Sequence, residues 1–357
     1  MTSLRLLRII TGGLLASVAL TGCAAANAAT VPSPVPAVEL RLGYFANLTH
    51  APALAGIQNG IFAKALGRTT LRTEVFNAGP AAIEALSSGA IDAAYVGPSP
   101  AINSFIRSGG ASLKIVSGAS IGGAQLVVRA GIADPSQLKG ATLATPQLGG
   151  SQDIALRFWL KSQGLSAPMT GGGEVTITPT DNPQILTLFG AGKLDGAWLP
   201  EPWASRLVVQ EKAHVLVDEA TLWPGGRFAT TELVVNSAYL SAHPSTVAEL
   251  VAANRDSVGW LNANPATAAS VINAALTRDA GKPLEPGVID RALAHVHFSV
   301  DPLAGTVRTL LAHSVAVGVG TAGSLSGLFD LTPLNRALRA AGTPTVSTGG
   351  LGSEVTP

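Results

Sequence analysis

Two stretches of this chain match one another without a gap, and this repeat constrains the fold more than any other feature of the sequence. Residues 80–101 read PAAIEALSSGAIDAAYVGPSPA, and residues 183–204 read PQILTLFGAGKLDGAWLPEPWA. At a constant offset of 103 residues, the aligned identities include Pro80 with Pro183, Gly89 with Gly192, Asp92 with Asp195, Ala94 with Ala197, and Ala101 with Ala204. A register held over this length is typical of two copies of one structural unit.

Each copy predicts the same order of elements. A helix begins at the proline, whose missing N–H would be unpaired in a first helical turn anyway. It ends at Gly89 or Gly192, as a left-handed cap would. A short apolar strand follows, over 91–96 or 194–199, and a proline-containing turn then leads into the next helix. The aspartate near the start of each strand is also repeated, which indicates a structural role.

The same offset carries the upstream segments into register, although few residues there are identical. The predicted strand 40–44 and its loop 45–50 fall on 143–147 and 148–153. Each loop leads into a predicted helix. We therefore expect two α/β lobes of the same construction.

The rest of the chain predicts how the lobes are connected. Two apolar runs, 125–129 and 230–236, are placed to carry the chain from the first lobe to the second and back. The remainder, 244–341, has helical periodicity and should return to the first lobe. The predicted α/β fold has discontinuous lobes around a hinged cleft. The first lobe is 38–124 plus 232–343, the second is 125–231, and 344–357 is a C-terminal tail.

The first residues have the features of a secretory signal with a lipid attachment site. Basic residues precede an apolar stretch, 9–20, that is too short to span a bilayer as a stable helix. It ends in Leu20-Thr21-Gly22-Cys23, which resembles a bacterial lipobox and contains the only cysteine of the chain. A diacyl anchor on Cys23 would hold firmly, because each buried CH₂ contributes about 0.8 kcal/mol. The alternative is a plain cleaved signal with an incidental cysteine.

These features predict how the chain is processed and where it resides. We expect residues 1–22 to be a signal peptide and residues 23–37 to be a lipidated tether rich in Ala, Pro and Val. No later segment is apolar over a sufficient length to span a membrane. The mature chain is expected as a monomer without a cofactor, anchored by lipid on the extracytoplasmic face of a cell membrane.

The order and spacing of several short motifs resemble a known family, the type II periplasmic solute-binding proteins of ABC importers for nitrate, sulfonates and taurine. The motifs are GYFANLTHAP (43–52), FNAGP (76–80), GAIDAAYVG (89–97), ATPQLG (144–149), GAWLPEPW (196–203) and RFATT (227–231). The resemblance runs from about Val38 to about Arg339. It implies the two-lobed type II periplasmic binding protein fold, a small-molecule ligand and a partner ABC permease, and it does not fix the ligand.

The candidate ligand site follows from the strand ends. In open α/β sheets, ligands bind beyond the carboxyl ends of strands, where helices begin. Backbone N–H groups at helix N-termini favour an anion by roughly 0.3–1 kcal/mol each. The loops that follow predicted strands are 45–50, 77–79, 97–99, 120–123, 148–153 and 200–203. The candidate ligand-binding residues are Tyr44, Asn47, Thr49, His50, Gly79, Ser99, Gln147, Ser151, Gln152, Glu201 and Trp203.

Several of these residues also have a structural explanation. Asn47, Thr49 and Ser99 are of the types that cap helix N-termini. His50 is either a donor to an anion or a surface or capping residue. Tyr44 and Gln147 occupy matched positions at the ends of the two first strands, so both are expected to face the cleft.

Glu201 bears on the class of ligand, since a buried carboxylate without a partner is costly. It either meets a cationic group of the ligand beside Trp203, or it pairs with a protein cation such as Arg206 or Arg227. Asp153 raises the same question, although an acid in a first helical turn is also normal. If these acids pair internally, the cleft suits an alkyl or aryl sulfonate; if they are free, a zwitterion such as taurine or a cationic solute fits better.

Other classes of function lack support. The formal net charge is +1, and no concentrated positive patch is visible, which argues against nucleic acid. The sequence has no Gly-x-Ser-x-Gly elbow, phosphate loop or His-Glu-x-x-His helix, so we expect no enzyme. His295 and His297 share one face if their run is a strand, but no further ligands cluster nearby, so we expect no metal site.

The most consistent function is therefore the substrate-binding lipoprotein of an ABC importer. It would capture a small organic anion between its lobes, with an aliphatic sulfonate as the first choice, and deliver it to the permease. Taurine, nitrate and a cationic or vitamin-like solute are the alternative ligands. A ligand sensor that feeds no importer is the alternative role.

Overall fold

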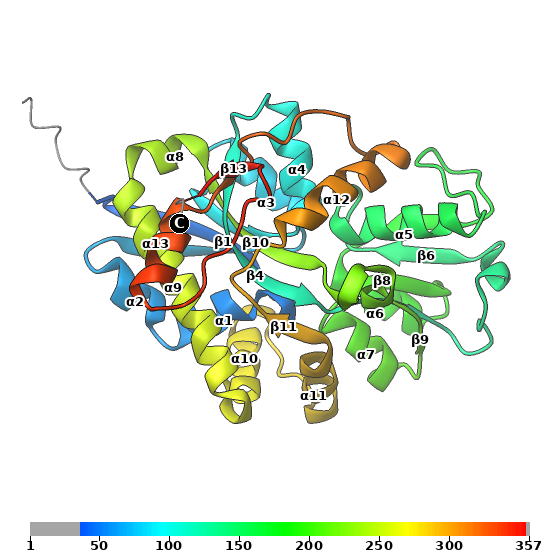
Figure 1. Ribbon diagram of the computed structural model, residues 1–357. Coiled ribbons are helices and arrows are strands. Elements are labelled where there is room, and N and C mark those ends of the chain that lie inside the picture. The colour runs from blue at the N-terminus through cyan, green and yellow to red at the C-terminus, as the bar shows by residue number, and fades with distance from the viewer. Residues whose placement is uncertain (1–35, 355–357) are drawn as a thin grey trace, which may run out of the picture. The chain divides into compact units, whose positions relative to one another are not determined.

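The computed structural model describes residues 36–354 of the chain. The predicted signal peptide, Cys23 and residues 355–357 lie outside the described residues. Residues 36–354 contain two β-sheets, each flanked by helices (Figure 1). We call each sheet with its helices a lobe. Within the described residues, no helix combines the length and apolar character needed to cross a membrane.

The first sheet has the order β13-β12-β4-β10-β3-β1-β2, and β11 pairs with β4. Its strands are β1 (Glu39–Phe45), β2 (Thr70–Phe76), β3 (Ala93–Val96), β4 (Leu113–Gly122), β10 (Ala229–Asn236), β11 (Val296–Phe298), β12 (Phe329–Asp330) and β13 (Gly352–Ser353). Its helices are α1 (Ala51–Gln58), α2 (Ile61–Leu66), α3 (Gly79–Ser87), α4 (Pro98–Arg107), α8 (Ser237–Ala242), α9 (Pro244–Ala263), α10 (Pro265–Ala280), α11 (Pro286–His295), α12 (Ala304–Ala316) and α13 (Thr332–Ala340).

The second sheet has the order β7-β6-β8-β5-β9. Its strands are β5 (Ala124–Val128), β6 (Thr142–Thr145), β7 (Thr176–Pro179), β8 (Gly196–Pro200) and β9 (His214–Asp218). Its helices are α5 (Ser151–Ser162), α6 (Asn182–Gly190) and α7 (Trp203–Gln210). Short 3₁₀ turns complete the two lobes: η1 (Leu48–His50), η2 (Pro135–Leu138), η3 (Glu219–Leu222) and η4 (Pro224–Gly226).

The two sheets have the same construction, as the repeat predicts. In the first, β1 is parallel to β2 and β3, and β10 lies antiparallel between β3 and β4. In the second, β6 is parallel to β7 and β8, and β5 lies antiparallel between β8 and β9. β5 brings the chain from the first lobe into the second, and β10 brings it back. These two strands therefore occupy equivalent positions in their sheets. The predicted two-lobed fold class is confirmed.

The repeated aspartates have the predicted structural role. The backbone N–H of Arg41 donates to Asp92 Oδ2 at 2.8 Å, and the backbone N–H of Thr142 donates to Asp195 Oδ2 at 2.8 Å. Each carboxylate thus satisfies an N–H near the start of β1 or β6, which are the equivalent strands of the two lobes. This shared contact explains why the same residue type stands at both positions.

The upstream register of the repeat was predicted wrongly by two residues. Leu42 pairs with Ala93, and Leu143 pairs with Gly196. The structural counterpart of Leu42 is therefore Leu143, whereas the constant offset matches Leu40 to it. A shift of two residues keeps each side chain on the same face of the sheet. The hydrophobic pattern of the strand is therefore the same in the predicted and the observed register.

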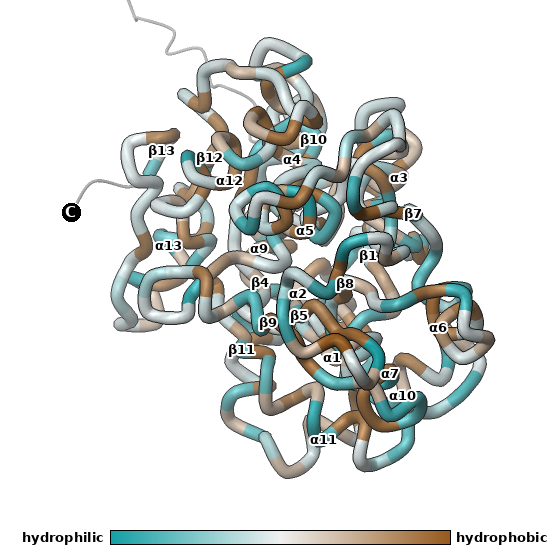
Figure 2. Tube along the Cα trace, turned by 90° about the vertical axis from the view of Figure 1, so that its right-hand side faces the viewer, coloured by the Kyte–Doolittle hydropathy of each residue, from teal (hydrophilic) through white to brown (hydrophobic). Residues whose placement is uncertain are grey.

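The chain passes between the sheets through two consecutive glycines. Gly122 ends β4 and Gly123 precedes β5, with φ of 73° and 71°. Both values lie in the left-handed region that favours glycine. A Cβ at Gly123 would also approach Val296 Cγ2 to 2.3 Å. The core is apolar on both sides of this crossing, with Leu42 buried in the first lobe and Leu126 and Leu143 buried in the second. Figure 2 shows hydrophobic residues along α1 of the first lobe, where residues 51–56 are buried.

Candidate ligand-binding site

A pocket lies between the two lobes at the point where helices of both begin. Its cavity volume is about 30 Å³, so the space for a ligand is small in this conformation. The lining residues are Phe45, Asn47, Thr49, His50, Asn77, Ala78, Gly79, Gly97, Pro100, Pro146, Gly150, Ser151, Gln152, Asn182, Pro200 and Thr230. We call this set the ligand pocket.

The N-termini of four helices meet at the ligand pocket, and none of the residues immediately before these helices makes a side-chain capping hydrogen bond. The residues before α3, α4 and α5 are Ala78, Gly97 and Gly150, and Asp181 before α6 makes no capping hydrogen bond either. The first N–H groups of a helix have no partner inside the helix, and they carry the positive end of its dipole. Such a cluster of helix N-termini favours an anion.

Small residues allow these helices to come close together. A Cβ on Gly97 would lie 2.5 Å from Ser151 Oγ, which belongs to the opposite lobe. The backbone N–H of Ser99 reaches the same Oγ at 3.4 Å. Gly97 has an ordinary extended conformation, with φ of −67°. The glycine is therefore needed for the close approach of α4 to α5 and not for its backbone angles.

The wall of the ligand pocket carries no lysine, arginine, aspartate or glutamate. His50 is its only titratable side chain, and burial lowers the pKa of His50 to about 3. The backbone N–H of Phe45 donates to His50 Nδ1 at 3.2 Å. The neutral ring therefore carries its proton on Nε2, which is left as a donor. An anion in this pocket would be stabilised by dipoles and polar hydrogens instead of by a formal positive charge.

The buried neutral His50 predicts a loss of stability in acid. Its pKa is lower in the folded chain than the 6.5 of an unperturbed histidine, so the unfolded chain binds more protons between those two values. The stabilisation is complete above pH 6.5 and is lost as the pH falls below it. Denaturant titrations should show that His50→Asn removes about 2 kcal/mol of the decrease in unfolding free energy between pH 7 and pH 5. Parallel pH curves for the two proteins would contradict this assignment.

Six of the predicted ligand-binding residues line the ligand pocket: Asn47, Thr49, His50, Gly79, Ser151 and Gln152. The structure places Tyr44, Ser99, Gln147, Glu201 and Trp203 outside its lining. Asn47 precedes η1 but makes no capping hydrogen bond. Instead, its Oδ1 accepts from Trp203 Nε1 at 2.7 Å, so Trp203 supports the pocket wall from behind.

Tyr44 points away from the pocket because its hydroxyl donates to Asp279 Oδ2 at 2.9 Å. With the corrected register its counterpart in the second lobe is Thr145 and not Gln147. Thr145 Oγ1 donates to Asp153 Oδ1 at 3.1 Å, so it too has an internal partner. Ser99 is buried next to the pocket, and its Oγ has no hydrogen-bond partner in residues 36–354.

Glu201 pairs internally, with a cation that the sequence did not indicate. Its side chain is fully buried, and Oε1 lies 3.0 Å from Nη1 of Arg291. Oε2 accepts from the backbone N–H of Ser205 at 3.0 Å. The expected partners are engaged elsewhere: Arg206 lies over the Trp203 ring, and Arg227 lies 3.7 Å from Asp301.

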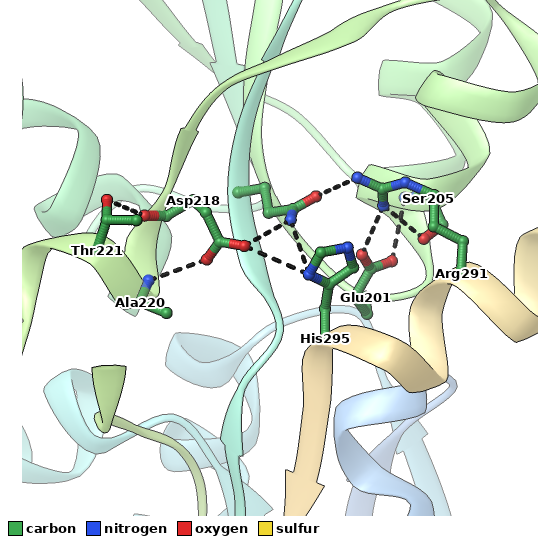
Figure 3. A network of polar contacts seen from close by, with 8 residues as sticks. Glu201, Ser205, Asp218, Ala220, Thr221, Arg291 and His295 are labelled. Atoms are coloured by element: carbon green, nitrogen blue, oxygen red, sulfur yellow. Dashed lines mark hydrogen bonds and ion pairs between the residues drawn. The ribbon is translucent and has the colours of Figure 1, made fainter. Parts of the chain in front are cut away.

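The Glu201–Arg291 pair belongs to a network that joins the two lobes (Figure 3). Arg291, in α11, also donates to Ser205 Oγ at 2.8 Å and to Gln125 Oε1 at 2.6 Å. Gln125 Nε2 donates to Asp218 Oδ2 at 2.9 Å, and His295 Nδ1 lies 3.3 Å from the same oxygen. Asp218 and Gln125 belong to the second sheet, whereas α11 continues into β11 of the first.

Asp153 is also paired internally. Its carboxylate lies 3.1 Å from Nε of Arg157, four residues along α5, and accepts the backbone N–H of Gly149 at 3.0 Å. Neither acid of the cleft is therefore free for a ligand. Within residues 36–354, no cluster of three histidine, cysteine or acidic side chains is arranged to hold a metal ion.

Sequence reasoning missed several pocket residues, and the repeat contained the signal for one of them. The offset of 103 residues places Asn182 opposite Gly79, which was predicted, and both line the pocket. Asn182 is buried, and its Oδ1 has no partner among the described residues. Thr230 has no such signal, since it reaches the pocket from β10 only after the chain has returned from the second lobe.

Comparisons with known proteins agree with this architecture. The model of the NMT1-like family matches residues 33–276. The comparison with curated proteins gave no match. The alkanesulfonate-binding protein SsuA of Xanthomonas axonopodis pv. citri, bound to MOPS, is 23% identical with a TM-score of 0.67, covering 81% of this chain and 96% of that one.

Two further solved structures are similar at lower sequence identity. The periplasmic nitrate-binding protein NrtA of Synechocystis PCC 6803 is 15% identical with a TM-score of 0.73, covering 89% of this chain and 92% of that one. The aliphatic sulphonate-binding protein SsuA of Escherichia coli is 18% identical with a TM-score of 0.63, covering 83% and 91%. At these identities the likeness establishes the fold.

Proposed function

Because the chain belongs to the NMT1-like family, we propose that it is the extracytoplasmic substrate-binding protein of an ABC importer. The periplasmic sulfonate- and nitrate-binding proteins that share its fold support this role. They are binding proteins and not enzymes, which favours capture and delivery over catalysis. The two lobes would hinge at Gly122 and Gly123 and at the segment that leads back into β10. They would close on the ligand before docking on a permease.

The ligand is a small organic anion, and an aliphatic sulfonate is our first choice. The observation that carries this choice is the convergence of uncapped helix N-termini on a wall without charged side chains. The donors of such a wall suit the oxygens of a sulfonate head. The internal pairing of Glu201 and Asp153 removes the two acids of the cleft that would otherwise favour a cationic solute.

Isothermal titration calorimetry tests this proposal directly. We expect ethanesulfonate or butanesulfonate to bind with a Kd of about 1 µM or below, equivalent to about 8 kcal/mol. Nitrate and phosphate, titrated in the same buffer, distinguish a sulfonate site from a general oxyanion site. If none of these anions binds while a cationic or vitamin-like solute does, the anion proposal is wrong.

We also propose that Cys23 carries a lipid that holds the protein on the outer face of a cell membrane. The sequence around Cys23 supports this proposal, and the chemistry requires a thiol at that position. Cys23→Ala should therefore move the protein from the membrane fraction to the soluble fraction, whereas Thr21→Ser, which retains the thiol, should leave it on the membrane. Persistence of Cys23→Ala on membranes washed with high salt would count against the anchor.

A further inference from the structure

One edge of the first sheet is open along its whole length. This edge is β2, which has seven residues, of which five are exposed, and which pairs with β1 on one side only. The other terminal strands of the two described sheets are shorter: β13 has two residues, β7 has four, and β9 has five that are all half-buried. An open edge strand is a template for the pairing of another strand, and proteins usually protect such edges.

The pairing of β2 with β1 identifies the backbone groups that point outward. The N–H of Thr70 donates to the carbonyl of Val38 at 2.9 Å, so the backbone groups of Thr70 face β1. Residues that bond to one neighbouring strand alternate along a strand with those that face the other side. The N–H and C=O groups of Leu71, Thr73 and Val75 therefore point away from β1, where no described strand meets them. β2 thus presents an uninterrupted row of donors and acceptors.

The equivalent edge of the second lobe is interrupted by a proline. β7 lies beside β6 in the same place that β2 occupies beside β1. The N–H of Thr176 donates to the carbonyl of Ala141 at 2.9 Å, so Ile177 and Pro179 are the residues that face outward in β7. Proline has no N–H and is a usual means of protecting an edge strand. The two copies of the repeat therefore differ here, and of these two strands only β2 keeps all its outward donors.

The side chains of β2 are complementary to a second copy of the same strand. When two β2 strands pair antiparallel, outward-facing residues must lie opposite one another, so one residue of the strand stands opposite itself. If that residue is Arg72 or Glu74, like charges lie opposite each other, which is unfavourable. If it is Thr73, Arg72 of each copy lies opposite Glu74 of the other, and Leu71 lies opposite Val75. Of the registers that use the whole strand, only the one centred on Thr73 pairs opposite charges.

The two charged residues are available for such a contact. Glu74 is exposed and has no ion-pair partner within residues 36–354. Arg72 contacts Glu39 of β1 through Nε, and its side chain is 69% exposed, which leaves the other guanidinium nitrogens accessible. Val75, which would meet Leu71 of the second copy, is 44% exposed. Charge and apolar surface therefore favour the same register.

We infer that β2 is a dimer interface, at which a second copy of this chain pairs antiparallel about a two-fold axis at Thr73. The two first sheets then form one continuous sheet, joined by about six backbone hydrogen bonds. Because the contact is isologous, it uses β2 of both copies and closes at the dimer. This inference goes beyond the proposed function, since it does not depend on any ligand, and it replaces the monomer expected from the sequence.

Sedimentation equilibrium of the full chain carrying Cys23→Ala, which removes the proposed anchor, tests the dimer. We expect a monomer–dimer equilibrium with a Kd of about 10 µM. Thr73→Pro should raise this Kd at least 10-fold, because it removes an outward N–H while the hydrogen bonds from β2 to β1 remain. A protein without Thr73→Pro that stays monomeric at about 200 µM, 20 times the expected Kd, would overturn the inference.

Charge variants test the register. Glu74→Arg places arginine opposite Arg72 of the second copy, and Arg72→Glu places glutamate opposite Glu74, so each should weaken dimerisation at least 10-fold. The double variant exchanges the two charges and should dimerise within 3-fold of the chain that keeps both residues. Glu211→Arg, a change of the same kind at an exposed position of the second lobe, should have no effect. A double variant as weak as the single variants would contradict the pairing of Arg72 with Glu74.

Cysteine cross-linking tests the position of the two-fold axis without relying on the proline variant. With Cys23→Ala, the variant Thr73→Cys holds a single thiol. Residues that exchange hydrogen bonds across an antiparallel pair have Cα atoms about 5.5 Å apart, which is within the range of a disulfide. Mild oxidation should therefore give a covalent dimer, whereas Thr176→Cys, at an exposed threonine of β7, should stay monomeric. Absence of the cross-link in Thr73→Cys would overturn the inference, whether or not Thr73→Pro folds.

Discussion

Replacing Arg291 by methionine is expected to lower the free energy of unfolding by about 3–5 kcal/mol, which is the usual effect of removing one partner of a buried ion pair. Glu201 would keep only its contact with Ser205 and would stand fully buried without a cation. Gln125 Oε1 and Ser205 Oγ would lose the donor that they share. Urea denaturation followed by circular dichroism measures the loss.

The matched control for this variant is Arg72→Met. Arg72 forms an ion pair with Glu39, but both side chains are substantially exposed, at 69% and 37%. Exposed pairs contribute about 0–1 kcal/mol, so the same substitution should have little effect there. Similar losses for the two variants, or a loss below about 1 kcal/mol for Arg291→Met, would show that the network does not stabilise the fold as its burial indicates.

The pH dependence of the unfolding free energy of Arg291→Met should identify the unpaired Glu201 carboxylate as the cause of the lost stability. Burial already raises the pKa of Glu201, and the Arg291 cation acts against that rise. Without the cation, the folded-state pKa rises further above the unfolded value, so the folded variant takes up a proton that the unfolded chain does not. The penalty is therefore largest at neutral pH and is relieved as the pH falls toward the unfolded pKa, about 4.3. Adding Glu201→Gln should recover part of the loss at neutral pH.

The two-lobed fold could be predicted from the sequence because the signals that reveal the repeat are local ones. Each copy carries its own helix start, glycine cap and apolar strand, and these signals act over a few residues. The structure preserves them in β2-β1-β3 and β7-β6-β8. What local pattern does not specify is the number of residues between copies. That is why the register of β6 was predicted two residues away from its true match.

The candidate site is less predictable, because its partners come from distant parts of the chain. Arg291 lies 90 residues after Glu201 and reaches it only because α11 packs on α7. A search near Glu201 in the sequence therefore finds Arg206 and misses the true partner. By contrast, residues on the loops after β1 and β6 were found, since the carboxyl ends of parallel strands share one edge of a sheet.

The largest effect on ligand binding is expected from Gly97→Val. The backbone of Gly97 accepts any side chain, so the folded lobe should tolerate valine, but the added Cβ would stand 2.5 Å from Ser151 Oγ and 3.4 Å from Ser151 Cβ. The N-termini of α4 and α5 would be held apart, and the N–H groups of the two lobes would not reach one anion together. Overpacking of this kind costs about 1–3 kcal/mol. We expect at least a 100-fold loss of affinity by calorimetry, equivalent to about 2.7 kcal/mol.

Two further variants test whether the close approach of position 97 to Ser151 is the reason for the lost affinity of Gly97→Val. In the double variant Gly97→Val with Ser151→Gly, the opposing side chain is removed, and at least 10-fold of the affinity should return. Gly305→Val makes the same change in the first turn of α12, where a Cβ meets no atom within 4 Å, and should bind like the wild type. The ligand-free stability of Gly97→Val should stay within about 1 kcal/mol of the wild type, because the lobes can remain apart. A variant that is strongly destabilised yet still binds would show that this contact serves the fold and that ligand capture does not depend on the approach of α4 to α5.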